Sequence, residues 1–214
     1  MTLRVLKLGG SLLDLPALAT RLDRWQARQQ PWANVMVVGG GPWADAIRTA
    51  DRIHGLGETA AHHLCLEAMG VTAALAHALF AGSQVCTGWD DVDPQLARTL
   101  QILDVRSLVD GWTAVEGAEP LPASWRVTSD SIATWVAQAL GAAELVLLKS
   151  ALPPEGLGVE ALAEKAFVDE YFPQAWLPHA LAGTALRIVN LRGEECPERY
   201  VVAGRSPRVL DPTA

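Results

Sequence analysis

A lysine and three small residues stand at the end of the first apolar run of the chain. The run at 3–8 reads LRVLKL, with Lys7 inside it, and Gly9, Gly10 and Ser11 follow. Glycines after a strand let backbone N–H groups converge on an anion, and a lysine beside them adds a compact positive charge. The pattern therefore indicates a site for a phosphate group.

Lysine is rare in this chain, which makes its position informative. Of the 17 basic residues, 14 are arginine and only Lys7, Lys149 and Lys165 are lysine. Because arginine supplies the ordinary surface charge, a lysine inside an apolar strand is hard to explain as a solubility residue. An ammonium group also does chemistry for which a planar guanidinium is less suited.

A second glycine cluster, Gly39 to Gly41, follows the apolar run VMVV at 35–38. Each cluster leads towards a predicted helix, whose N-terminus adds the positive end of its dipole. Either cluster alone could be no more than a tight turn between a strand and a helix. Together, and with Lys7 beside the first, they favour two loops that hold a polyphosphate from two sides.

Two other phosphate-binding motifs explain these glycines less well. The P-loop motif needs a Gly-Lys pair, and the chain has none. Gly39, Gly41 and Ala44 satisfy a relaxed dinucleotide fingerprint, with Glu58 near the spacing of a ribose-binding acid. That fingerprint lies on the second strand, is interrupted by Pro42, and leaves the first glycine cluster unexplained.

Apolar periodicity and chain breakers predict how the elements position these residues. We expect strands at 3–8, 34–39, 84–87, 101–106 and 186–191, helices over 14–29 and from 42, one kinked helix or two over 58–81, and strand, helix and strand over 125–150. Continuous apolar strands suit a sheet covered on both faces, so the predicted class is α/β, a three-layer α/β/α sandwich with a mainly parallel sheet. In such sheets ligands bind beyond the carboxyl ends of the strands.

Size and composition limit the class of protein. With 214 residues the chain is expected to form a single domain over 1–214, with a loose tail at 206–214. The net charge of -7 gives no general attraction to nucleic acid or to an anionic membrane, and no apolar stretch reaches transmembrane length. Three cysteines without a CxxC pair favour reduced thiols, so we expect a cytoplasmic protein.

Three segments resemble the amino acid kinase superfamily, which includes acetylglutamate kinase, aspartokinase and uridylate kinase. They are VLKLGGSLL at 5–13, VVGGGPWADAIR at 37–48 and VTSDSIATWVAQALGAAELVLLKS at 127–150, in the family's order. The short length and the segments DRIHGLGETAAHHL at 51–64 and AFVDEYFP at 166–173 are most similar to small archaeal-type members. One of these is the kinase of methanofuran biosynthesis, and methylotrophic bacteria carry relatives.

The resemblance implies roles for the residues around the first glycine cluster and the last segment. Catalysis is expected from Lys7, Asp130 and Lys149, with Asp130 orienting the lysines. The ATP phosphates are expected to contact Gly9, Gly10, Ser11, Ser129, Lys149 and Ser150. Asp130 could instead serve only as a cap of the helix that follows it.

The chain departs from the family pattern just after Lys149. A DGV-type turn is expected there and PPEG stands at 153–156, and the GGM-plus-lysine element that gives acetylglutamate kinase its second catalytic lysine is absent. We therefore assign the second cation to Lys149, with Lys165 as the alternative.

The acceptor is expected beside the second glycine cluster, where the family binds it. The candidate residues are Gly39, Gly40, Gly41, Asp45, Arg48, Arg52, Glu58 and His62. Arginines suit an acceptor that already carries phosphate, and an acid suits a hydroxyl or an amine. The charged residues among them could equally be solvated helix positions.

These assignments predict a kinase that transfers the γ-phosphate of ATP, with Mg²⁺ and no metal site in the protein itself. The acceptor would be a small phosphorylated or carboxylated molecule, and the resemblance points to an aminomethylfuran-methyl phosphate. A uridylate kinase-like enzyme and a nucleotide-binding subunit with weak catalysis are the alternatives. Since the family dimerises, a homo-oligomer is also expected.

Overall fold

The computed structural model describes residues 2–111 and 120–201, so the expected tail at 206–214 lies outside the described residues. The strands are β1 (Leu3–Leu8), β2 (Ala33–Val38), β3 (Gln84–Cys86), β4 (Leu100–Leu103), β5 (Glu144–Lys149), β6 (Ala185–Asn190) and β7 (Glu198–Val201). The α-helices are α1 (Leu18–Ala27), α2 (Gly41–His54), α3 (Glu58–Leu79), α4 (Ser129–Ala139), α5 (Val159–Glu164) and α6 (Phe172–Ala182), and 3-10 turns lie at Gly10–Leu12, Trp89–Asp91 and Val105–Gly111.

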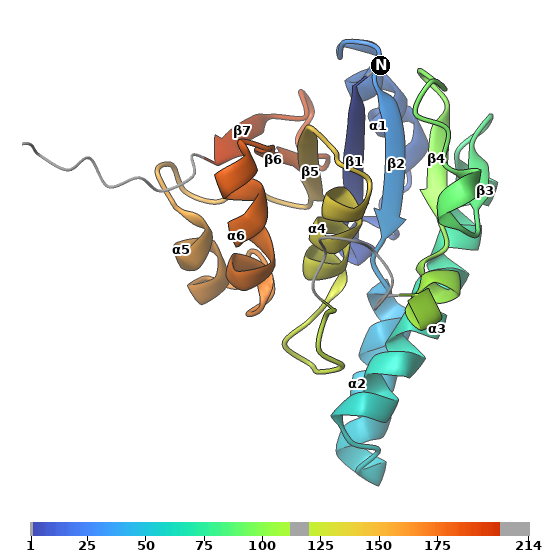
Figure 1. Cartoon of the computed structure of the whole chain (residues 1–214), viewed down its shortest axis with the longest axis vertical. Coiled ribbons are helices and arrows are strands. Elements are labelled where there is room, and N and C mark those ends of the chain that lie inside the picture. Colours follow the sequence, from blue (N-terminus) through green and yellow to red (C-terminus); the bar gives the residue numbers. More distant parts are fainter. Residues whose placement is uncertain (1, 112–119, 202–214) are drawn as a thin grey trace, which may run out of the picture.

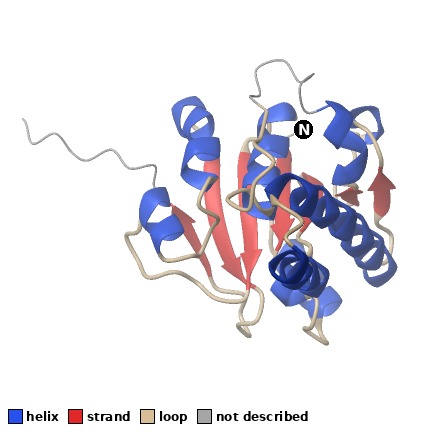
Figure 2. Ribbon diagram, turned by 90° about the horizontal axis from the view of Figure 1, so that it is seen from below, coloured by secondary structure: helices blue, strands red, loops and turns tan. Residues whose placement is uncertain are grey.

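The strands form one sheet in the order β3-β4-β2-β1-β5-β6-β7 (Figure 1). All neighbours pair in parallel except β6 and β7, which are antiparallel. Helices cover both faces of the sheet, as Figure 2 shows. The predicted α/β class with a mainly parallel sheet is confirmed.

The central strand β1 contributes to two separate cores because its side chains alternate between the faces of the sheet. Val5 packs in the cluster that contains residues of α4, whereas Leu6 and Leu8 pack in the cluster that contains residues of α1. Lys7 shares the parity of Val5. Its side chain therefore lies on the α4 face of the sheet.

The segment at 58–81 forms one helix, α3, which runs beside α2 as the pair at the lower right of Figure 1. Gly70 lies in the middle of α3. A Cβ atom at that position would stand 1.9 Å from Nε of Arg106. The glycine therefore makes room for an arginine that crosses the helix.

The prediction of a strand at the start of segment 125–150 was wrong. Those residues form turns, in which the Val127 N–H donates to the Ser124 carbonyl at 3.1 Å and the Tyr171 N–H donates to the Arg126 carbonyl at 3.1 Å. The interior strand β1 is already paired with β2 and β5, so the sheet offers no free edge beside it. The segment crosses the end of the sheet without joining it.

Two predicted elements are shorter than expected because turns replace their ends. The helix expected over 14–29 begins at Leu18, after a turn in which the Leu15 N–H donates to the Leu12 carbonyl at 3.0 Å. The strand expected to reach 106 ends at Leu103. There the Asp104 carboxylate accepts from the Arg106 N–H at 3.1 Å and turns the chain.

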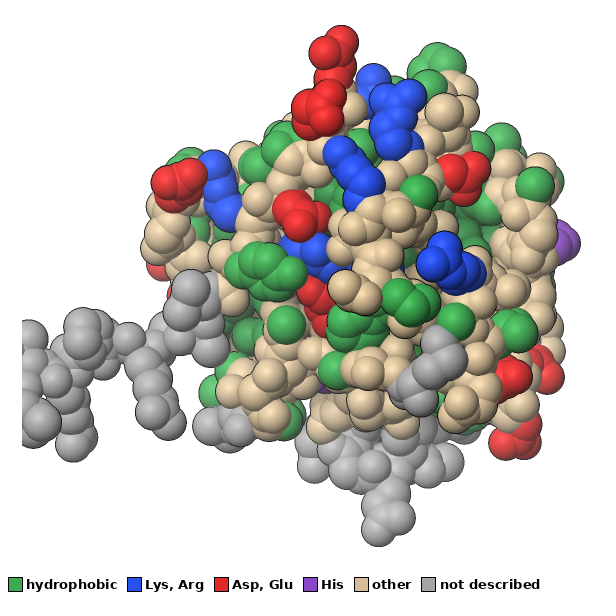
Figure 3. Space-filling view, turned by 90° about the horizontal axis from the view of Figure 1, so that it is seen from above, with side chains coloured by type: hydrophobic (Ala, Val, Ile, Leu, Met, Phe, Trp, Pro, Cys, Tyr) green, Lys and Arg blue, Asp and Glu red, His purple; other side chains and the backbone are tan. Residues whose placement is uncertain are grey.

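Buried charges lie where the parallel strands begin, at the edge opposite the glycine clusters. Glu144 accepts from Arg187 at 2.8 Å and pairs with Arg4 at 3.5 Å, and all three side chains are buried. The surface over this edge carries basic and acidic side chains close together (Figure 3). Among the described residues, no helix is long and apolar enough to cross a membrane.

Candidate active site

One buried carboxylate joins two lysines at the carboxyl end of the sheet. Nζ of Lys7 lies 2.9 Å from Oδ1 of Asp130, and Nζ of Lys149 lies 2.9 and 2.7 Å from its two oxygens. The side chains of Lys7 and Asp130 are 6% and 7% exposed, and that of Lys149 is 17% exposed. The arrangement places two positive charges on one negative charge.

The positions of these residues in their elements explain why they meet. Lys7 lies on the α4 face of β1, and Lys149 is the last residue of the neighbouring strand β5. Asp130 is the second residue of α4, which packs over β1. The first turn of a helix favours a carboxylate, because the helix dipole is positive there.

Burial and pairing shift the pKa values of this group in a consistent way. Burial alone would raise the pKa of Asp130, but the ammonium groups of Lys149 and Lys7 outweigh it and hold the pKa at about 2. Burial lowers the pKa of Lys149 to about 8, although Asp130 partly opposes that shift. Asp130 is therefore ionised at neutral pH, and Lys149 loses its proton as the pH rises through about 8.

The two glycine clusters lie against each other, backbone to backbone. A Cβ atom on Gly10 would stand 2.3 Å from the backbone nitrogen of Gly41, and a Cβ on Gly39 would stand 2.7 Å from Oγ of Ser129. Gly41 also has a φ of +53°, which favours glycine. The glycines are thus needed for the contact between the loops, in addition to any approach of a ligand.

A cavity of about 220 Å³ opens beside this contact, and nine of the predicted site residues line it. They are Gly10, Ser11, Gly39, Gly40, Gly41, Asp45, Arg48, His62 and Ser129. The rest of the wall is mainly apolar and includes Leu66, Met69, Val127 and Ile132. The cavity therefore suits a small molecule with an apolar body and polar ends.

The other predicted site residues lie outside this cavity wall. Arg52 lines a shallower groove next to it, whereas Glu58 is exposed at the first residue of α3. Gly9 and Ser150 follow β1 and β5 beside the paired lysines. Lys165 is exposed at the end of α5, and no described contact brings it to Asp130.

Trp125 is a cavity residue that the sequence did not reveal. Its ring lines both the cavity and the neighbouring groove, and the Arg48 guanidinium lies 5.4 Å from the ring centroid. Its Nε1–H donates to Asp51 at 2.8 Å, which fixes the ring. An isolated tryptophan in a turn carries no periodic signal, so the local pattern could not have assigned it.

His62 enters the cavity wall as a neutral group. It is only 6% exposed, and burial lowers the pKa of its imidazole. A hydrogen bond with the Ser124 backbone and the neighbouring His63 are smaller influences on that pKa. An uncharged imidazole suits a hydrogen bond to an acceptor better than an ion pair.

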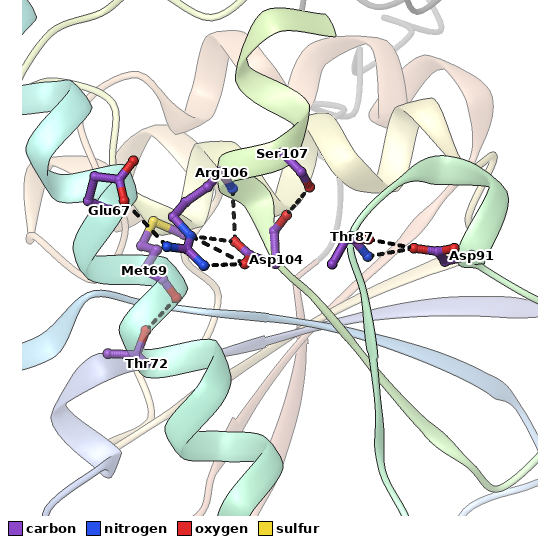
Figure 4. A network of polar contacts seen from close by, with 8 residues as sticks. All are labelled: Glu67, Met69, Thr72, Thr87, Asp91, Asp104, Arg106 and Ser107. Carbon is purple, nitrogen blue, oxygen red and sulfur yellow. Dashed lines mark hydrogen bonds and ion pairs between the residues drawn. The ribbon is translucent and has the colours of Figure 1, made fainter.

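Another carboxylate at this edge of the sheet, Asp104 after β4, is already engaged. Figure 4 shows it held by Arg106, whose Nη2 donates to Oδ2 at 2.7 Å and which also pairs with Glu67 at 3.4 Å. The hydrogen bonds from Arg106 lower the pKa of Asp104. This network ties the end of β4 to α3, next to the cavity residue Met69.

Across residues 2–111 and 120–201, no three His, Cys, Asp or Glu side chains gather closely enough to hold a metal ion. Mg²⁺ in kinases is commonly held by substrate phosphates and one or two carboxylates, so its binding does not require such a cluster.

Comparison with solved structures finds proteins that share the fold of this chain. Similar solved structures include uridylate kinase from Archaeoglobus fulgidus, with a TM-score of 0.58, 17% identity and coverage of 95% of this chain and 91% of that one. UMP kinase from Ureaplasma parvum has a TM-score of 0.60 and 11% identity, covering 94% of this chain and 100% of that one. UMP kinase from Bacillus anthracis has a TM-score of 0.56 and 11% identity, covering 92% and 98%.

These identities show a shared fold, whereas the sequence itself shows the family. No match was found among curated protein sequences. The model of the amino acid kinase family matches residues 2–151, a span that holds both glycine clusters, Asp130 and the two lysines paired with it. The chain therefore belongs to the amino acid kinase family and is a phosphotransferase.

Proposed function

We propose that this protein transfers the γ-phosphate of ATP to a small phosphorylated or carboxylated acceptor. The observation that carries the proposal is the pair of ammonium groups on buried Asp130, directly beside two touching glycine loops and a cavity. Phosphoryl transfer needs positioning and the neutralisation of charge on the phosphate oxygens more than it needs a base. Two fixed ammonium groups and convergent backbone amides meet that need.

In this proposal the residues at the strand ends have different roles. Lys7 and Lys149 neutralise the transferring phosphate, and Asp130 holds both at fixed positions. The backbone amide of Gly10 binds a nucleotide phosphate oxygen, with hydroxyl groups from Ser11, Ser129 and Ser150. The N–H of Gly9 already donates to the Leu148 carbonyl at 2.9 Å, so Gly9 contributes space for the phosphate and not a donor. Bound Mg²⁺ would add charge neutralisation on the phosphates.

The cavity would hold the acceptor, and its wall favours a flat, partly apolar molecule with a charged end. An aminomethylfuran-methyl phosphate has such a body, an amine that could donate to Asp45 and a phosphate that Arg48 could bind. These contacts would replace the ion pair that Asp45 and Arg48 make with each other at 2.6 Å. We propose a methanofuran-type pathway for this acceptor, as the resemblance of the sequence implies. A homo-oligomer stays a prediction.

A uridylate kinase-like reaction is the second candidate, because the similar solved structures are uridylate and UMP kinases. A nucleotide-binding subunit with weak catalysis was suggested by the absent GGM-plus-lysine element. The position of Lys149 weakens that suggestion, since it supplies a second ammonium group next to Lys7.

Acceptor-dependent ADP release tests these candidates. The protein would be mixed with Mg²⁺-ATP and a panel that includes an aminomethylfuran-methyl phosphate, UMP and simple phosphomonoesters. Turnover with the furan phosphate supports the proposal, and turnover with UMP alone replaces it by the second candidate. ATP binding without turnover on any acceptor would favour the subunit.

We expect kcat/KM for ATP to fall as the pH rises above about 8, because Lys149 in the free enzyme has a pKa near that value and its ammonium form binds phosphate. Measurements of kcat/KM at fixed ionic strength between pH 6 and 10 test for this decrease. Lys149→Arg stays charged throughout this range, so the fall should vanish in whatever activity that variant keeps. A parent profile that is flat to pH 10 would contradict the assignment.

Trp125→Ala should raise the KM of the acceptor roughly tenfold and leave the KM of ATP nearly unchanged, because the ring lines the proposed acceptor cavity and the groove next to it. Trp125→Phe keeps an aromatic face and loses only the hydrogen bond to Asp51, so a smaller change is expected. Steady-state kinetics in both substrates separate the effects. An unchanged acceptor KM in the alanine variant would remove the ring from the binding site.

A further inference from the structure

The carboxylate of Asp169, which lies about forty residues later in the chain, holds the first turn of α4. Oδ2 of Asp169, in the segment between α5 and α6, accepts from the Thr128 N–H at 2.9 Å, the Thr128 hydroxyl at 2.8 Å and the Ser131 N–H at 3.0 Å. Its Oδ1 accepts from the Ser131 hydroxyl at 2.5 Å. These four bonds span about forty residues of sequence.

Asp169 accepts a hydrogen bond from the first turn of α4 that the N-cap side chain would usually accept. The N-cap residue of α4 is Thr128, and its side chain makes no capping hydrogen bond to the helix. Its hydroxyl donates to Asp169 instead. Because Asp130 lies between the two residues that Asp169 binds, any shift of this turn would move the carboxylate that joins the lysines.

Asp169 is also the second negative charge near Lys149. The charged groups that face Lys149 are Lys7 from β1, Asp130 from α4 and Asp169, while its neighbour on β6 is the uncharged Asn190. Asp130 and Asp169 both favour the protonated form of Lys149 and so oppose the lowering of its pKa. Burial, followed by the charge of Asp130, raises the pKa of Asp169 itself.

We propose that Asp169 is a positioning residue for the proposed phosphoryl transfer: it fixes the turn that carries Asp130, and it places a second negative charge near Lys149. This inference rests on the proposed function for its effect on the rate. Its effect on Lys149 is independent of any reaction. The two parts can therefore be measured separately.

Asp169→Asn separates the charge from the contacts. The amide oxygen can replace Oδ2 and accept from Thr128 and the Ser131 N–H, and the amide nitrogen can donate to the Ser131 hydroxyl, which accepts as well as it donates. The matched control is Glu170→Gln. Glu170 is the adjacent acid, 69% exposed, and it pairs at the surface with Arg126 at 2.7 Å.

The protonation of Lys149 would be followed by NMR titration with ¹³C-labelled lysine. The chain has only three lysines, so few signals appear, and Lys165→Arg identifies the exposed one. In Asp169→Asn the Lys149 midpoint should move to lower pH, with kcat lowered about tenfold or more and the KM of ATP little changed. Glu170→Gln should move neither quantity. An unchanged Lys149 midpoint in a folded Asp169→Asn protein would overturn the inference.

A second variant tests the contacts if Asp169→Asn does not fold. Ser131→Ala removes one of the four hydrogen bonds and keeps the carboxylate, so kcat should fall severalfold while the Lys149 midpoint stays in place. An unchanged kcat in this variant would overturn the positioning role. If the parent protein turns over no acceptor at all, the proposed function fails, whereas the titration still decides whether Asp169 controls Lys149.

Discussion

Asp130→Asn is expected to lower kcat by about 10²–10³-fold and to leave α4 formed. An asparagine fills nearly the same space as the aspartate, but it has no charge to hold the two ammonium groups. The pKa of Lys149 is already lowered to about 8, and without the carboxylate it would fall further, so Lys149 would lose its proton near neutral pH. The variant would then lack both the anchor and one of the two positive charges.

Steady-state rates and thermal unfolding of the same preparations test this expectation. Asp23→Asn, an exposed substitution on α1, is the matched control and should change neither quantity. If Asp130→Asn unfolds at a much lower temperature, and the missing folded fraction accounts for the lost rate, then Asp130 has only a structural role. Unchanged turnover would lead to the same conclusion.

The part of the site that follows buried strands could be predicted from the sequence. Lys7 and Lys149 interrupt or end apolar runs, and Asp130 opens a helix. In a parallel sheet these positions converge at one edge, whatever the details of packing. Local periodicity therefore predicted most of the strands and the edge at which they end, whereas the roles of Asp130 and Lys149 were implied by the resemblance to the family.

The parts held by irregular segments could not be predicted in this way. Asp169 reaches α4 from about forty residues away, and Trp125 lines the cavity from a turn. Such contacts depend on where loops cross the end of the sheet, which no repeat in the sequence encodes. The wrong strand prediction near Trp125 has the same origin, because local propensity does not show whether a strand finds a free edge.

The glycine clusters show how one pattern can have two physical causes. The sequence indicated phosphate binding, and the structure shows that Gly10 and Gly41 leave no space for a Cβ atom between the loops. Close contact of the loops that follow the paired strands β1 and β2 keeps both loops next to Ser129 and the cavity. A larger residue at either position would therefore separate the proposed nucleotide loop from the proposed acceptor loop, even before any ligand binds.

Lys7→Arg should leave ATP affinity within about an order of magnitude and lower kcat by roughly a hundredfold or more. The charge is kept, but Lys7 is 6% exposed, with its Nζ 2.9 Å from Asp130, so the site has no room for a wider group. A guanidinium would displace either the Asp130 carboxylate or the phosphate that the first glycine loop binds. Since a misplacement of about 1 Å can cost ~10²-fold in rate, geometry and not charge should limit the variant.

Rates measured beside nucleotide affinity decide whether Lys7 acts by its position or only by its charge. Lys165→Arg makes the same exchange at an exposed residue and should leave both quantities unchanged. If Lys7 merely neutralised bound phosphate, the buried arginine would serve as well, and the two variants would have nearly equal kcat values. That result would leave Lys149 as the cation whose position matters, and it would make the lysine of the first strand an electrostatic partner of Asp130 alone.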